Sequence, residues 1–403
     1  MRLMLIHKAE LQVYFEPIIL SILFTPWTLR SVTFPNRMVV SPMCNYSARD
    51  GFADDFHLVT LGRYALGGAG TVFVEATAVQ EHGRITHGDL GLWKDEHIAG
   101  LSRIAKFVQA QGAVAAIQLG HAGRKASMQR PWFGNSALNA DDHARGEQPW
   151  PIVAPSAIAV ADGWLMPQAL TLDAISQLKN DFVAAALRAV EAGYQIIEFH
   201  CAHGYLLHSF LSPLSNVRTD QYGGSLENRM RLIIEIASAV RRAIPESMPL
   251  FARLSTVDDV DDGWVIEDSI LLAKALKQEG VDVIDCSSGG ILGSATGGSA
   301  VIPRTPRTPG FQVPWAARIR QEAQLPTMAV GLILTPAQAE EVLATAAADL
   351  VAIGREALDN PNWPQHAAQV LKDDSGYKYW PKQFGWWLNV RHGILQKLGM
   401  LKR

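Results

Sequence analysis

Cysteine is scarce in this sequence, and no charge of one sign is in clear excess. The 403 residues contain three cysteines, Cys44, Cys201 and Cys286, which lie far apart and form no CxxC pair. Their spacing argues against a disulfide framework and predicts a reducing compartment, for which we expect the cytoplasm. The formal net charge is −3 without any basic tract. We therefore expect neither a nucleic acid nor a membrane surface as a partner.

The sequence also lacks a long uninterrupted apolar run. Met1–Leu20 is rich in Leu and Ile, but Lys8, Glu10 and Glu16 interrupt it. It has no continuous apolar centre and no small-residue cleavage site, which argues against a secretory signal, and it is too broken to span a membrane. We expect residues 1–22 to be a loosely attached extension and residues 23–403 to be the folded unit.

Short apolar runs, by contrast, recur along the chain. Each is continuous rather than alternating, as in strands that are buried on both faces of a parallel sheet. The eight runs are Met38–Ser41, Thr71–Ala78, Val114–Leu119, Gln195–His200, Leu250–Leu254, Val281–Cys286, Thr327–Val330 and Asp349–Ile353. Amphipathic segments lie between them, namely Leu178–Glu191, Leu226–Ala243, Ile266–Glu279 and Pro336–Ala346.

Eight such units predict an α/β fold, a (β/α)8 TIM barrel. A doubly wound sheet is the alternative, but no GxGxxG follows the first run and no GxxxxGK[ST] occurs. Residues 121–170, rich in Pro and Trp, are too long for an ordinary loop after strand 3, so we interpret them as a lid or cap. Ser287–Pro314 is a second long interval, and about residues 376–403 form a C-terminal tail.

In such barrels the functional side chains lie where the strands end. Reading along the eight runs gives one set of candidates. They are Ser41, Pro42, Met43 and Cys44 after the first run, Ala76 and Gln118 in the next two, His200 and His203 at the fourth, Arg253 in the fifth, Ser288 and Gly289 after the sixth, Gly331 after the seventh, and Gly354 and Arg355 after the eighth.

The members of this set together indicate FMN. Glycines after the last two runs let backbone N–H groups approach a phosphate, and Arg355 adds a bidentate cation. Gln118 can pair with an amide-like edge. Arg253 can neutralise a ring that becomes anionic on reduction. A phosphate, an amide edge and a cation beside a redox-active ring describe this cofactor.

The segment from Phe199 to Tyr205 indicates the substrate chemistry. Its two imidazoles can donate hydrogen bonds to a developing oxyanion, and its phenol can deliver a proton, which suits an activated carbonyl compound. A metal site that includes His208 and Cys201 is the alternative. However, Cys201 faces away from His200 at strand spacing, and no carboxylate or CxxC completes a site, so we expect no metal.

Longer motifs resemble the old yellow enzyme family of FMN-dependent ene-reductases, from about Leu23 to the C-terminus. The matching segments are Ser41–Ser47, Gln118–Lys125, His200–Tyr205, Phe210–Asn216 and Arg218–Arg229. Cys44, with Tyr46 two residues on, resembles the thermophilic-like and xenobiotic-reductase subgroup. Arg124 and Lys125, in the second motif, either bind the nicotinamide phosphate or are solvated bases of the lid.

The resemblance implies an NADPH dehydrogenase or ene-reductase with non-covalent FMN, reduced by NADPH or NADH. Ser41–Cys44 and Ala76 would touch the isoalloxazine, Gln118 would hold its pyrimidine edge, and Arg253 would stabilise the reduced flavin. His200, Ser288 and Gly289 would also contact the cofactor. Gly331, Gly354 and Arg355 would bind its phosphate.

The resemblance also implies a ping-pong mechanism for α,β-unsaturated carbonyl compounds and for nitro compounds. His200 and His203 would hold the substrate oxygen, hydride would pass from flavin N5 to the β-carbon, and Tyr205 would protonate the α-carbon. Cys44 would tune the flavin and line the substrate site with Tyr46. Some relatives insert a C-terminal arginine into the neighbouring subunit's site, and Trp386 takes that place here.

The relatives suggest a homodimer or a homotetramer. Two other functions remain possible from the residues alone. One is a flavin-binding sensor without turnover, against which the His/His/Tyr set argues. The other is an aldolase or isomerase without flavin, but none of the eight runs ends in a Schiff-base lysine.

Overall fold

A computed structural model describes residues 21–292, 304–374 and 376–400. The expected extension therefore lies almost wholly outside the described residues, which begin at Ser21. From there the chain is attached to the body of the molecule, because Glu340 accepts hydrogen bonds from the Ser21 hydroxyl and from the N–H groups of Ile22 and Leu23. A short 3-10 helix, η1 (Ile22–Phe24), follows.

Eight parallel strands close into a barrel, as the apolar runs predict. In order around the barrel they are β3 (Met38–Val40), β4 (Thr71–Ala78), β5 (Val114–Gly120), β8 (Ile196–Cys201), β9 (Leu250–Ser255), β10 (Val283–Ser287), β11 (Thr327–Ala329) and β12 (Leu350–Ile353), and β12 pairs with β3. Every predicted run overlaps one of these strands, and the TIM barrel is confirmed.

The interior of the barrel is a packed apolar core. Alternate strand residues point inward, including Phe73 and Phe251, whose ring centroids lie 6.2 Å apart. An antiparallel hairpin, β1 (Trp27–Leu29) and β2 (Val32–Phe34), covers the amino-terminal end of the strands, and Phe34 belongs to the interior cluster. Since apolar side chains fill most of that end, the charged and amide side chains Glu75, Gln118, Glu198, Arg253 and Asp285 lie nearer the opposite end.

Helices cover the outside of the barrel. They are α1 (Asp55–Leu66), α2 (Ile98–Ala110), α4 (Leu172–Glu191), α6 (Leu226–Ala243), α7 (Ile266–Gln278), α8 (Val313–Ala323), α9 (Pro336–Ala344), α10 (Arg355–Asp359) and α11 (Trp363–Val370). The predicted boundaries hold for α6. Helix α4 begins six residues earlier than predicted, because Thr171 caps it by accepting the N–H of Ala174.

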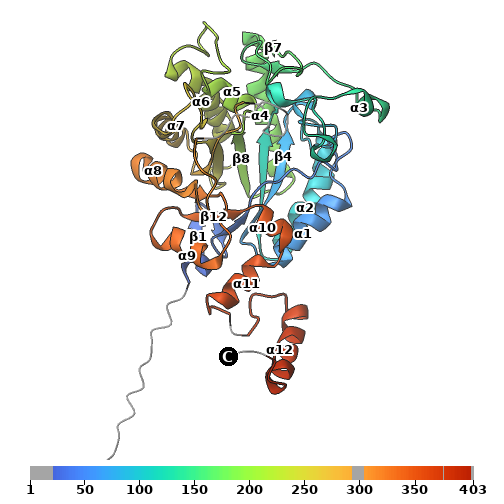
Figure 1. Ribbon diagram of the computed structural model, residues 1–403, viewed down its shortest axis with the longest axis vertical. Coiled ribbons are helices and arrows are strands. Elements are labelled where there is room, and N and C mark those ends of the chain that lie inside the picture. Colours follow the sequence, from blue (N-terminus) through green and yellow to red (C-terminus); the bar gives the residue numbers. More distant parts are fainter. Residues whose placement is uncertain (1–20, 293–303, 375, 401–403) are drawn as a thin grey trace, which may run out of the picture.

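The long segment after β5 contains several short elements. They are η4 (Gly123–Lys125), η5 (Pro131–Phe133), α3 (Ala140–Ala144) and a two-stranded sheet of β6 (Val153–Ala154) and β7 (Gln168–Ala169). Short helices η2 (Glu81–Gly83) and η3 (Asp95–His97) follow β4, and α5 (Leu206–Leu211) follows β8. Element β7 lies at the top of the molecule and α3 projects to the upper right (Figure 1).

The C-terminal tail forms a further helix, α12 (Lys382–Lys397), which the sequence pattern did not predict. It stands apart from the barrel (Figure 1), and within it only Gly385 is buried. Across the described ranges, the model contains no helix with both the length and the apolar character of a membrane span.

Candidate active site

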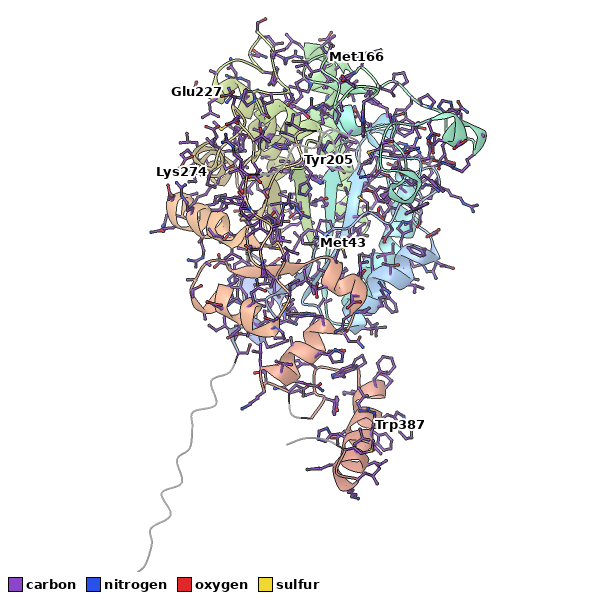
Figure 2. All side chains as sticks on the ribbon, viewed as in Figure 1. Met43, Met166, Tyr205, Glu227, Lys274 and Trp387 are labelled. Carbon is purple, nitrogen blue, oxygen red and sulfur yellow. The ribbon has the colours of Figure 1, made fainter. Side chains whose placement is uncertain are left out.

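The two histidines and the tyrosine predicted as catalytic lie together at the carboxyl end of β8. His200 is the fifth residue of the strand, and His203 and Tyr205 belong to the turn that leads into α5. The ring centroids of His200 and His203 are 5.2 Å apart, and those of His200 and Tyr205 are 4.8 Å apart, all edge to face. Figure 2 shows Tyr205 inside the body of the molecule.

The surroundings keep both imidazoles neutral and the phenol protonated. Burial, and then the charge of Arg253, hold the pKa values of His200 and His203 well below their usual range. Burial raises the pKa of the Tyr205 phenol. Nδ1 of His200 accepts the N–H of Ala202, so Nε2 carries the ring proton. The site thus offers neutral hydrogen-bond donors beside a retained proton.

The loop after β3 brings Cys44 and Tyr46 to the same place. Both pack in an apolar cluster with Tyr205 and with residues of the long segment after β5. Burial raises the pKa values of the Cys44 thiol and the Tyr46 phenol. A buried carboxylate anchors the loop between them, because Glu75 accepts the backbone N–H of Asn45 at 2.8 Å and its side-chain amide at 3.2 Å.

A row of buried polar side chains crosses the barrel interior at its carboxyl end. Gln118 on β5 donates to Glu198 on β8 at 2.8 Å. Nε of Arg253 on β9 lies 3.1 Å from Asp285 on β10, although the geometry is too bent for a regular hydrogen bond. Burial, and then Asp285, raise the pKa of Glu198, while Arg253 opposes the rise.

Sequence reasoning missed both carboxylates of this row. The signal was present, since Glu198 and Asp285 are acidic residues inside otherwise apolar runs.

The polar row fits a flavin. Ser41 Oγ and Glu198 Oε2 are buried and have no hydrogen-bond partner among the residues that the structure describes. Buried polar atoms without partners are costly unless a bound group satisfies them. An isoalloxazine ring presents the polar edge that such atoms require.

A hollow of about 130 Å³ lies at the ends of β11 and β12. Gly331, Gly354 and Arg355 line it. Gly331 has φ +116°, a conformation open to glycine, and a side chain there would meet the amide of Gln312. Ser288 donates to the same Gln312 at 2.8 Å. These backbone amides and the Arg355 cation fit a phosphate, so the chain has places for both halves of FMN.

Other predicted residues lie elsewhere or have different contacts. Trp386 is on α12 and is 61% exposed. The next residue, Trp387, lies far from Tyr205 (Figure 2). Arg124 is not a solvated lid base, because it is buried and donates to the carbonyl of Ile291. Lys125 donates to the carbonyls of His203 and Gly290. Burial lowers the pKa of Lys125 to about 7.

His208, the further candidate of the metal hypothesis, contacts a carboxylate instead. Its Nε2 lies 2.8 Å from Asp258, and both side chains are fully buried. Within residues 21–292, 304–374 and 376–400, no group of three or more His, Cys, Asp or Glu side chains is arranged to hold a metal ion.

The barrel and its carboxyl-end site are those of a flavin-dependent oxidoreductase, and comparison with known proteins identifies the family. The chain belongs to the NADH:flavin oxidoreductase / NADH oxidase family, whose pattern matches residues 22–374. It is 46% identical to an NADH:flavin oxidoreductase of Gibberella zeae over 86% of this chain and 85% of that protein. It is also 46% identical to an NADPH dehydrogenase of Halalkalibacterium halodurans over 87% of this chain and 94% of that protein.

Solved structures of similar proteins support the same family. Morphinone reductase in complex with tetrahydroNAD is 26% identical, with a TM-score of 0.69 over 87% of this chain and 91% of that chain. An old yellow enzyme homologue from Zymomonas mobilis is 25% identical, with a TM-score of 0.69 over 86% and 92%. The protein is thus an FMN-dependent NADPH oxidoreductase of the old yellow enzyme family, with NAD(P)H as its reductant.

Proposed function

We propose that this enzyme reduces the activated C=C bond of α,β-unsaturated carbonyl compounds, and that nitro compounds are a second substrate class. One observation carries the proposal, namely the grouping of His203 and Tyr205 around the buried His200, with ring centroids 5.2 Å and 4.8 Å from that of His200. Two neutral donors can hold one substrate oxygen, and a protonated phenol beside them can supply a proton. A protein that only binds flavin has no need of such a group.

The histidines act on the substrate oxygen. Nε2–H of His200 donates to it, and so does His203, whose Nε2 is held 2.7 Å from the Ser287 hydroxyl and whose Nδ1 is left for the substrate. Their hydrogen bonds strengthen as negative charge develops on the oxygen, which polarises the conjugated double bond. Bound FMN supplies the hydride. Tyr205 then gives its proton to the α-carbon, because burial has kept it protonated.

The remaining residues hold the cofactor and exclude water. We assign Gln118 and Arg253 to the flavin ring, with Ser41–Cys44, Ala76, His200, Ser288 and Gly289 against it, and Gly331, Gly354 and Arg355 to the phosphate. Residues 121–170 form the cap, whose Trp150 and Trp164 pack in one cluster with Cys44, Tyr46 and Tyr205. A dry site makes each of these electrostatic contacts stronger.

Two other observations support an oligomeric assembly and a cellular location. The exposed apolar side chains of α12 support a homodimer or a homotetramer, in which Trp386 reaches a neighbouring subunit's substrate site. The three free cysteines support the cytoplasm as the location.

An anaerobic stopped-flow experiment tests the proposed reaction. The flavin band should bleach with NADPH and return on addition of 2-cyclohexenone. In Tyr205→Phe, NADPH should still bleach the band at close to the wild-type rate. Reoxidation by the enone should be slower by about 10²-fold, because a general acid contributes about that much. Parallel runs with NADH and with a nitro compound compare the reductants and the substrate classes.

Tyr194→Phe is the matched control. It also removes a buried phenol, but that phenol donates to the carbonyl of Leu101 outside the site, so both half-reactions should keep their rates. Wild-type protein that bleaches with NADPH and never recovers with an enone would overturn the substrate class. An unchanged reoxidation rate in Tyr205→Phe would overturn the role of Tyr205.

A further inference from the structure

A fully buried histidine and aspartate lie directly beneath the catalytic turn. His208 is on α5, three residues after Tyr205, and Asp258 is in the loop after β9. Nε2 of His208 is 2.8 Å from Oδ1 of Asp258, in a bent arrangement, and neither atom has another hydrogen-bond partner among the described residues. The proposed reaction uses neither side chain directly.

The hydrogen bonds of the pair fix the tautomer of His208. Nδ1 accepts the backbone N–H of Gly204 at 2.8 Å, so the ring proton of the neutral imidazole lies on Nε2, towards Asp258. The other oxygen of Asp258, Oδ2, accepts hydrogen bonds from the Ser212 hydroxyl at 2.6 Å and from the backbone N–H of Trp264 at 2.8 Å. Hence Asp258 orients the ring, and the ring presents an acceptor to Gly204.

The turn has an unfavourable backbone that needs such support. His203 has φ +60° and Gly204 has φ +76°, so two consecutive residues are left-handed. For a residue with a side chain, such as His203, this conformation costs on the order of 1 kcal/mol. A side chain at Gly204 would also overlap the carbonyl of Gly290.

Side chains hold the backbone of the turn on both sides of His203. Ser255 accepts the N–H of His203 at 2.9 Å. The carbonyl of His203 and the N–H of Gly204 belong to one peptide, and Lys125 donates to that carbonyl at 2.9 Å while His208 accepts that N–H. His203 keeps the contacts of Ser255 and Lys125 when the His208 contact is lost, so we expect the loss to shift Gly204 and Tyr205 more than His203.

We propose that His208 and Asp258 are positioning residues that fix the Gly204 peptide and thereby aim the Tyr205 phenol at the substrate carbon. This role rests on the proposed ene-reduction, in which Tyr205 is the proton donor.

Two substitutions at His208 each keep only one of its two contacts, either the one with the Gly204 N–H or the one with Asp258. The side-chain oxygen of His208→Asn lies close to the place of Nδ1 and can still accept the Gly204 N–H. The amide of His208→Gln reaches the place of Nε2 and Asp258 instead. We expect His208→Asn to keep enone-driven reoxidation within about threefold of wild type. His208→Gln should slow it by about 10-fold to 100-fold, the scale of a displaced catalytic group.

Asp258→Asn tests the tautomer. Because the Trp264 N–H needs an acceptor, the new amide group must turn its NH2 towards His208. Nε2 then becomes the acceptor and the ring proton moves to Nδ1, against the Gly204 N–H. Reoxidation should fall as in His208→Gln, and the histidine ¹⁵N shifts should show the exchange of tautomers. If this variant fails to fold, the comparison of the two His208 variants still tests the positioning role.

A double-mutant cycle separates positioning from a general loss of structure. In the Tyr205→Phe background, His208→Gln should cause no further loss in the rate of enone-driven reoxidation, because the group that it aims is already absent. FMN content and the rate of bleaching by NADPH should stay at wild-type values in every variant.

Equal losses in both backgrounds, or equal rates in His208→Asn and His208→Gln, would overturn the positioning role. Wild-type enzyme that bleaches with NADPH but is not reoxidised by an enone would instead show that the proposed function has failed, and this role would fail with it. The two failures are distinguishable because the first requires a normal wild-type reaction.

Discussion

The protonation states of five side chains at the proposed site are set by burial more than by nearby charges and hydrogen bonds. The pKa values of His200 and His203 are lowered, and those of Tyr205, Tyr46 and Cys44 are raised, and burial is the largest cause in each case. All five groups are therefore neutral near pH 7. A site of neutral groups keeps its donors available without the cost of an unpaired buried charge.

Asp89 gives a testable case at this scale. It lines the hollow that contains His200 and Tyr205, and burial raises its pKa to about 7. An unfolded aspartate titrates near 4, so between about pH 4 and pH 7 the folded chain binds a proton that the unfolded chain has lost. Asp89 therefore stabilises the fold at low pH, and this contribution is lost as the pH rises to about 7.

We expect the stability advantage of wild type over Asp89→Asn to shrink from pH 5 to pH 7, by up to about 1.4 kcal/mol per pH unit, and to level off above pH 7. Urea unfolding of both proteins at pH 5, 6, 7 and 8 measures it. Two parallel stability curves would contradict the raised pKa of Asp89.

At the scale of elements, the parallel strands bring the residues of the proposed site to the same end of the barrel. Parallel pairing places Gln118 beside Glu198, and His200 beside Arg253. The chain then turns sharply, and glycines occupy the tightest points after β10 and β11. The strands supply rigid positions, and the turns let the backbone approach a ligand.

Gly331→Ala tests the turn after β11. A φ of +116° strains any residue with a side chain, and the new methyl group would press on Gln312 beside the proposed phosphate site. We expect the dissociation constant for FMN to rise about 10-fold or more, the equivalent of at least about 1.4 kcal/mol. Fluorescence titration of the apoprotein with FMN measures the change.

Gly193→Ala is the matched control for this experiment. Gly193 has φ +90° but faces open space in the turn before β8, so its substitution strains the backbone without reaching the site. Its melting temperature should fall while its FMN affinity stays unchanged. Equal FMN affinities in the two variants would refute the phosphate assignment for the β11 turn.

At the scale of the whole molecule, the barrel is closed and its interior is filled, but the apolar side chains of α12 are not covered by the rest of the chain. Phe384, Trp387, Ile394 and Leu398 are spaced by three, seven and four residues, so they follow one side of the helix, and each is at least half exposed. A helix with an apolar side away from its own core is typical of an interface between subunits.

We expect the double change Ile394→Lys/Leu398→Lys to lower the mass of the native assembly, because charge would replace apolar contact across the interface. Light scattering after gel filtration measures this mass. Gln396→Lys, half a turn round the helix, is the control and should keep the wild-type mass. If the double variant keeps the wild-type mass as well, α12 does not join the subunits.

The sequence by itself determined a parallel sheet covered by helices, because continuous apolar runs are buried on both faces of such a sheet. The number of runs and the lack of a GxGxxG or GxxxxGK[ST] motif then favoured a barrel over a doubly wound sheet. It also indicated which end of the barrel would be polar, and the motifs around His200 and Gln118 pointed to the family that the comparisons confirm. These features depend on local periodicity and on short segments, which a linear sequence displays.

Only the tertiary structure decided how residues far apart in the chain meet. Gln118 and Glu198, Arg253 and Asp285, and His208 and Asp258 become neighbours because adjacent parallel strands pair, and no spacing in the sequence shows those contacts. Arg124 and Lys125 were ambiguous as basic residues, and burial beneath the catalytic turn gave them structural partners. Helix α12 was missed because its apolar side has no core partner within the chain, so it lacks the pattern of a helix that packs on a barrel.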